Sequence, residues 1–167
     1  MTSNIKKKTK LLTILMVISL ILILTLAFMC LFPALYIGGA FEAPMTPKIA
    51  QLDYNKYSKE FNAVVQYILN NEINDFYINE NDDIDISDKD TYKALITLIK
   101  VGYNPIGITK NTLYFQKYAT LDCGKGIMYS IDGKLPYMQF LTDTKELSVE
   151  NWYYYEDDYN KWRAEHN

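Results

Sequence analysis

The chain has 167 residues, of which 17 are basic, 20 are acidic and 49% are hydrophobic, and its formal net charge is −3. Two cysteines, one histidine and one arginine are too few for a disulfide framework, a Cys/His zinc cluster or arginine-based recognition of nucleic acid. Residues 42–167 carry 13 basic and 20 acidic groups, a net charge of −7, which disfavours nucleic acid and anionic lipid as partners.

The first predicted element is a membrane span. Residues 11–32 contain no charged side chain and only three polar ones. As a helix rising about 1.5 Å per residue they extend roughly 33 Å, enough to cross a hydrocarbon core of about 30 Å. We therefore expect a transmembrane signal anchor over residues 11–37. Residues 1–10 contain four lysines, so the positive-inside rule places this basic tail in the cytoplasm and the following domain outside.

A cleaved signal peptide is the alternative for this segment. Gly38 and Ala40 have the spacing for cleavage before Phe41, but the apolar region of a signal peptide runs only about 7 to 15 residues. The longer stretch favours an uncleaved, single-pass anchor. Lysine outnumbers arginine sixteen to one, a bias typical of AT-rich coding sequence, which indicates a low-GC bacterium.

A linker is predicted next, followed by an extracytoplasmic domain over residues 51–167. Residues 38–50 contain two glycines and two prolines, which disfavour a helix. Asp53 can cap the first helix of the domain, and Asn70 stands near its end. The apolar residues of this helix recur at three- and four-residue steps and share one face: Tyr54, Tyr57, Phe61, Val64, Val65 and Ile68.

A second helix follows a short strand at residues 76–78 and an acidic stretch at residues 80–90. Ser87 and Asp90 have the spacing of a capping box, and Gly102 suits a left-handed helix end. The apolar residues on one side of this helix are Tyr92, Leu95, Ile96 and Ile99.

Beyond the second helix the apolar period changes from helical to alternating, which predicts strands. Three short runs contain the alternating residues Ile106, Ile108, Leu113, Phe115, Ile127, Tyr129 and Ile131. Turns are expected at residues 110–111, 122–126 and 132–133, and a proline makes residues 135–141 an edge strand or a loop. The pattern predicts an α+β fold, in which an antiparallel meander carries two helices packed on one face.

The last segment, residues 151–164, fits two structures. Its aromatic residues form a helical stripe, but a run of aromatics is also typical of strands. We expect a strand through Tyr155 and a short helix from Asp157.

The acidic stretch has the spacing of a calcium-binding loop. Oxygen-bearing side chains fall at positions 1, 3, 5, 7, 9 and 12 of such a loop: Asn79, Asn81, Asp83, Asp85, Ser87 and Asp90. Ile84 replaces the glycine of the sixth position, and Asp90 is shorter than the usual glutamate. Weak calcium binding and a solvated acidic loop that caps the second helix are both compatible with this pattern.

Residues 122–126 share only superficial features with a phosphate loop or a reactive-cysteine site. Ala119 and Gly126 occupy the positions that decide a phosphate loop, so that motif fails. The one histidine that could activate Cys123 is His166, next to the end of the chain. We expect a turn between two strands here, and we find no catalytic set of side chains in the sequence.

The C-terminal aromatic residues are the predicted binding surface, because tyrosine and tryptophan are favoured at interfaces. Consecutive residues of a strand alternate between its faces, so one set is expected in the core and the other at the surface. The alternative is that all of them complete the core. The candidates are Trp152, Tyr153, Tyr154, Tyr155, Tyr159 and Trp162.

The segment from Leu113 to Arg163 resembles a group of small, single-pass, membrane-anchored bacterial proteins of no assigned function. The resemblance is carried by the runs Thr120–Asp122, Gly126–Ile127, Tyr129–Gly133 and Trp152–Tyr155. It implies the same location and nothing about activity.

Together these features predict a membrane-tethered extracytoplasmic domain that binds a protein or peptide partner at the cell surface, in an immunity-like or sensor-like role. The acidic domain favours a cationic partner, and the lipid bilayer is contacted through residues 11–37. The alternatives are a cell-envelope hydrolase that uses two carboxylates in an aromatic-lined groove, and a weak calcium-binding module. No cofactor other than calcium is expected.

Overall fold

The computed structural model describes residues 16–23, 25 and 45–166. Within these ranges, none of the helices combines the length and the apolar character needed to cross a membrane. The predicted anchor over residues 11–37 falls mostly outside the described residues, and residues 16–23 of it are helical. The basic tail, residues 1–10, and the linker through residue 44 also lie outside them. Residues 45–166 belong to a compact unit with a hydrophobic core of its own.

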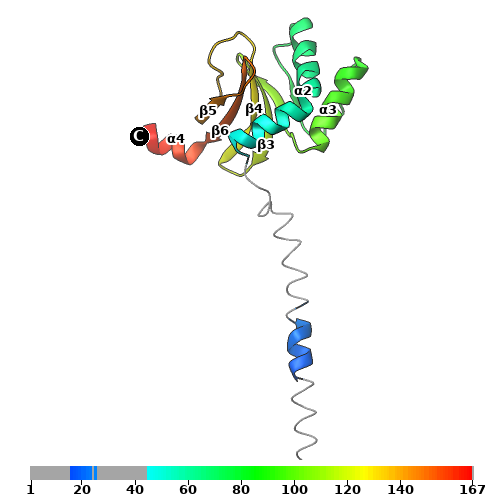
Figure 1. The fold of residues 1–167 in the computed structure, drawn as a ribbon, viewed down its shortest axis with the longest axis vertical. Coiled ribbons are helices and arrows are strands. Elements are labelled where there is room, and N and C mark those ends of the chain that lie inside the picture. The colour runs from blue at the N-terminus through cyan, green and yellow to red at the C-terminus, as the bar shows by residue number, and fades with distance from the viewer. Residues whose placement is uncertain (1–15, 24, 26–44, 167) are drawn as a thin grey trace, which may run out of the picture. The chain divides into compact units, whose positions relative to one another are not determined.

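The domain begins with a long, bent helix, α2 (Pro47–Asn70). The hydroxyl of Thr46 caps it by accepting a hydrogen bond from the backbone N–H of Ile49, and Pro47 fits the first turn, where a missing N–H costs nothing. The helix therefore starts inside the expected linker and well before Asp53, the expected cap. Non-helical backbone angles at Tyr57 (φ −116°, ψ 21°) bend it (Figure 1).

A second helix, α3 (Lys89–Lys100), packs beside α2 (Figure 1). Its cap is Asp88, whose Oδ2 accepts a hydrogen bond from the N–H of Thr91 at 2.8 Å, and not the expected Ser87. A carboxylate at this end also complements the helix dipole. The helix ends before Gly102, which adopts the predicted left-handed conformation (φ 96°).

The strands form one antiparallel sheet in the order β1-β2-β3-β4-β6-β5. They are β1 (Tyr77–Ile78), β2 (Ile106–Thr109), β3 (Thr112–Ala119), β4 (Cys123–Ser130), β5 (Leu141–Glu146) and β6 (Trp152–Asp158). The predicted α+β fold is confirmed, but the meander holds only from β1 to β4, because β6 inserts between β4 and β5.

Two boundaries near the sheet differ from the predictions. The expected turn at residues 122–126 is displaced, since β4 already begins at Cys123. At the C-terminus the predicted order of strand and helix is correct, but β6 continues to Asp158 and α4 (Tyr159–His166) starts only then. In Figure 1, α4 lies on the β5–β6 side of the sheet, away from α3.

The core lies between the sheet and the two helices. Phe61 of α2 is at its centre, with its ring edge against Phe115 of β3 at 4.9 Å, against Tyr103 at 5.1 Å and against Trp152 of β6 at 5.6 Å. The predicted faces of α2 and of the first strands contribute to this cluster. The helix α3 adds Ala94, Leu95 and Leu98, while Tyr92, expected on the buried side of that helix, is 43% exposed. Such edge-to-face pairs add stability beyond the apolar area that they bury.

The sheet is also covered on the face that points away from the helices. Met128 and Tyr155 are fully buried there, although their neighbours Ile127 and Tyr154 are the residues that face the helices. Residues 131–140, which connect β4 to β5, contribute the cover. Within this segment Pro136 is buried, and the N–H of Tyr137 donates to the Thr112 hydroxyl at 2.7 Å.

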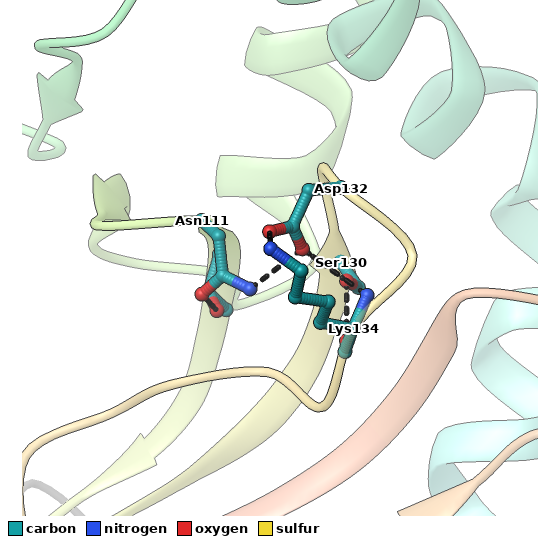
Figure 2. Close-up of polar contacts among 5 residues, drawn as sticks. Asn111, Ser130, Asp132 and Lys134 are labelled. Carbon is teal, nitrogen blue, oxygen red and sulfur yellow. Dashed lines mark hydrogen bonds and ion pairs between the residues drawn. The ribbon is translucent and has the colours of Figure 1, made fainter.

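A polar cluster holds the start of this connecting segment. Figure 2 shows Asp132 between Asn111, Ser130 and Lys134. Its Oδ1 accepts from the Asn111 amide at 2.8 Å and from the Lys134 N–H at 3.1 Å, while the Ser130 hydroxyl donates to the Lys134 carbonyl at 2.6 Å. The Asn111 bond and then the Lys134 N–H lower the pKa of Asp132 to about 2. The carboxylate therefore belongs to the turn and not to a ligand site.

Candidate functional site

A pocket of about 280 Å³ lies at the end of the sheet where β3 turns into β4. It brings together two segments that the sequence suggested separately, the one around Cys123 and the aromatic C-terminal region. The lining residues are Gln116, Thr120, Leu121, Asp122, Cys123, Gly124, Phe140, Asp157 and Tyr159.

The floor of the pocket is a glycine of strand β4. A Cβ on Gly124 would overlap Oδ1 of Asp157 and lie 2.8 Å from Nε2 of Gln116, so both side chains converge over this residue. At Gly126, two positions along the strand, a Cβ would overlap the Phe115 carbonyl oxygen. At both positions the absence of a side chain lets a neighbouring group lie against the strand, which explains why these glycines stand in a strand and not in the expected turn.

Asp157 is the distinctive charged group of this pocket. Burial raises the pKa of its carboxyl group, although hydrogen bonds from the backbone N–H groups of Gly124 and of Asp157 itself act in the opposite direction. Its Oδ1 is covered and accepts no hydrogen bond. The ion pairs formed by the described residues involve the carboxylates of Asp53, Glu156 and Asp132, not that of Asp157. Asp157 as a whole is only half-buried and lines the pocket, so a cation from outside meets the exposed part of the carboxylate and not the covered Oδ1.

Two further unpartnered polar atoms lie on the same face of the sheet. They are the hydroxyls of Tyr155 and of Thr144, which stand opposite each other on β6 and β5. Burial, and next the charge of Asp157, raises the pKa of Tyr155 well above its usual value. Buried polar groups in folded proteins are nearly always paired, so these three mark the region as unusual.

Apolar groups complete the wall of the pocket. Phe140 packs its ring at 5.0 Å from that of Tyr159 and at 5.4 Å from that of Trp162. Leu121, at the tip of the turn between β3 and β4, is fully exposed. The pocket thus combines two acidic residues, Asp122 and Asp157, with one amide, aromatic rings and an exposed aliphatic side chain.

The opposite face of the same strand ends carries a second polar group. Cys123, Glu156 and Asp158 place their ligand atoms within 4.8 Å of one another, the only such set in the described ranges. Lys125 already neutralises Glu156 at 2.7 Å. Burial raises the pKa of the Cys123 thiol, which makes it a poor nucleophile and a poor metal ligand. His166 bonds to the Trp162 carbonyl within α4.

The six predicted aromatic residues do not share one surface. Trp152 and Tyr154 belong to the core under the helices, and Tyr155 is buried on the other face. Tyr153 and Trp162 are half-buried, and Tyr159 is exposed at the pocket. Alternation along β6 is as predicted, but both of its faces are covered.

The predicted calcium residues line an exposed loop. Ile84 and Ile86 turn inward and pack against the core. Their alternation explains the two-residue spacing of the polar side chains Asn81, Asp83, Asp85 and Ser87, all of which are exposed. Asn79 is half-buried and its N–H donates to Oδ2 of Asp82 at 2.7 Å, whereas Asp90 lies in the first turn of α3. Calcium binding stays a prediction.

Two larger hollows lie along α2 and α3, at about 420 and 570 Å³. Their polar linings are mostly exposed side chains such as Lys59, Lys93 and Asp90, and they hold none of the three unpartnered buried atoms. We therefore favour the smaller pocket at Asp157 as the candidate site.

Sequence reasoning missed the roles of Gln116, Phe140 and Asp157. The signal that could have found the site is the pair of glycines around Lys125, which continues the alternation of Ile127 and Tyr129 and so belongs to a strand. Glycine inside a strand marks the close approach of another group.

Comparison with known proteins adds no further evidence. No protein-family model matches the chain, and neither the curated proteins nor the solved structures contain a match to it.

Proposed function

We propose that this chain is a membrane-tethered extracytoplasmic domain that binds a cationic protein or peptide at the cell surface. The pocket at Asp157 receives a lysine or arginine side chain of that partner. The net charge of −7 over residues 42–167 attracts such a partner before contact.

The observation that carries the proposal is the unneutralised carboxylate of Asp157. Asp53, Glu156 and Asp132 each have a lysine partner within the domain. Asp158 accepts a hydrogen bond from the N–H of Lys161 at 2.9 Å at the start of α4. Of these five carboxylates, only that of Asp157 is both partly buried and left with an oxygen that accepts no hydrogen bond. A basic side chain supplies the missing charge.

The surroundings of Asp157 suit a long basic side chain. Aromatic rings attract cations through their faces, and Phe140 and Tyr159 line the pocket. The stem of a lysine or arginine is apolar and packs well against such rings and against Leu121. The Gln116 amide adds a polar group near the carboxylate.

Defined peptides test the pocket directly. The full chain in detergent is titrated with a short lysine-rich peptide and with its glutamate-rich counterpart, and binding is followed by calorimetry. We expect binding of the lysine peptide only, and a loss of about tenfold in affinity in Asp157→Asn, as for a charge-assisted contact. Asp132→Asn is the matched control and keeps the affinity. Equal affinity in wild type and Asp157→Asn contradicts the proposal.

The tether has its own test. The proposal places residues 11–37 in the bilayer and the C-terminus outside the cytoplasm. A reporter that is active only outside the cytoplasm, fused after Asn167, is then active. If only a cytoplasmic reporter is active, the proposed extracytoplasmic location is wrong, but the result of the peptide titration is unaffected.

A further inference from the structure

The strand β5 forms one edge of the sheet. Among the described residues it pairs only with β6, so its other side has no neighbouring strand there, whereas the strand at the opposite edge, β1, has only two residues. Asp143, Lys145 and Glu146 are exposed. An exposed edge presents backbone N–H and C=O groups to another chain.

The direction of these backbone groups follows from the register. The N–H of Leu147 donates to the carbonyl of Trp152 at 2.8 Å, and hydrogen-bonded pairs alternate along an antiparallel ladder. Lys145 and Asp143, two and four positions away from Leu147, therefore bond to β6. Thr144 and Glu146 direct their N–H and C=O groups outward.

We propose that β5 pairs antiparallel with β5 of a second copy of this chain, about a two-fold axis at Thr144. This register joins the outward groups of Thr144 to those of the second Thr144, and it places Glu146 opposite Thr142 of the second copy, where the register shift between Leu141 and Asp143 interrupts the regular ladder. Asp143 then lies opposite Lys145 of the second copy, and Lys145 opposite Asp143. These are non-hydrogen-bonded positions, where side chains of paired strands come closest.

The charges select this register over its neighbours. An axis at Asp143 places the two Asp143 side chains opposite each other, and an axis at Lys145 does the same for two lysines. The axis at Lys145 also joins outward backbone groups, those of Thr144 to those of the second Glu146, but in both alternatives like charges stand directly opposite each other, which is destabilising. Only the axis at Thr144 makes the strand complementary to itself, which favours a second copy over an unrelated peptide as the occupant.

Charge reversal tests the pairing without touching the Asp157 pocket. The full chain in detergent is examined by analytical ultracentrifugation, with circular dichroism as the check on folding. We expect a wild-type dimer whose dissociation constant rises about tenfold or more in Asp143→Lys and in Lys145→Asp. The double variant Asp143→Lys/Lys145→Asp restores the dimer. An equimolar mixture of the two single variants forms a heterodimer, because every opposed pair is then again of opposite sign.

A second variant removes a backbone donor. Thr144→Pro deletes the outward N–H that this register joins to the second copy and keeps the bonds to β6, so it is expected to give a monomer. A wild-type chain that stays monomeric overturns the proposal. So does a dimer that both single charge variants leave unchanged, or a double variant that remains as weak as the single ones.

Discussion

Asp53 and Asp157 are both partly buried carboxylates of this domain, and their surroundings differ. Oδ2 of Asp53 accepts hydrogen bonds from the Lys117 ammonium and from the Tyr103 hydroxyl, the latter at 3.0 Å. These contacts join α2 to β3 and to the segment after α3. Asp157 has an unpartnered oxygen and no ion pair among the described residues. The first carboxylate is therefore part of the framework, while the second is free to bind.

The largest effect is expected from removing the paired carboxylate. Asp53→Ala leaves the Lys117 ammonium, 27% exposed, and the buried Tyr103 hydroxyl without their acceptor. We expect a loss of about 3 kcal/mol in the free energy of unfolding, measured by urea denaturation. Tyr103→Phe removes one donor but keeps the ion pair and the ring, and should cost only about 1 kcal/mol. Equal losses in the two variants would show that the ion pair adds nothing.

The opposite sign is expected for the unpaired carboxylate. Asp157→Asn removes a desolvated charge, so the free energy of unfolding at neutral pH should rise by about 1 kcal/mol. Burial raises the folded-state pKa of Asp157 above 3.8. Its proton therefore stabilises the fold below that value, and this contribution is lost as pH rises through the folded pKa. The difference between variant and wild type should vanish on acidification below 3.8, where the carboxyl group is protonated in both the folded and the unfolded state. A destabilised Asp157→Asn at neutral pH would mean that Asp157 is paired after all.

The smallest effect is expected at Asp132, which is exposed and screened by solvent. Its folded-state pKa is depressed from 3.8 to about 2, chiefly by the hydrogen bond from Asn111 (Figure 2). The stability it adds is present above the unfolded pKa and is lost as pH falls through the folded one. Asp132→Ala should thus lower the melting temperature slightly at neutral pH, and this difference should disappear towards pH 2. A difference that grows in acid would contradict the assignment.

The sequence alone was sufficient to predict the buried faces of α2 and of the first strands, but not that of α3, where Tyr92 is exposed and Ala94 and Leu98 are buried. The apolar steps along α2, at Phe61, Val64 and Ile68, and the alternation at Leu113 and Phe115 record burial on one side, which is a local property of a helix or strand. The strand β5 gave no such signal. An edge strand such as Leu141–Glu146 buries little, and its polar residues carry no period.

The sequence therefore determined the fold class, the acidic character of the domain and the position of the apolar segment near the N-terminus of the chain. The tertiary structure decided the order of the last strands, because nothing local states that β6 pairs with both β4 and β5. That pairing places Asp157 over Gly124 and beside Gln116, and it leaves β5 at the edge. The pocket depends on contacts between residues far apart in the chain, and these contacts form only when the strands of the sheet have paired.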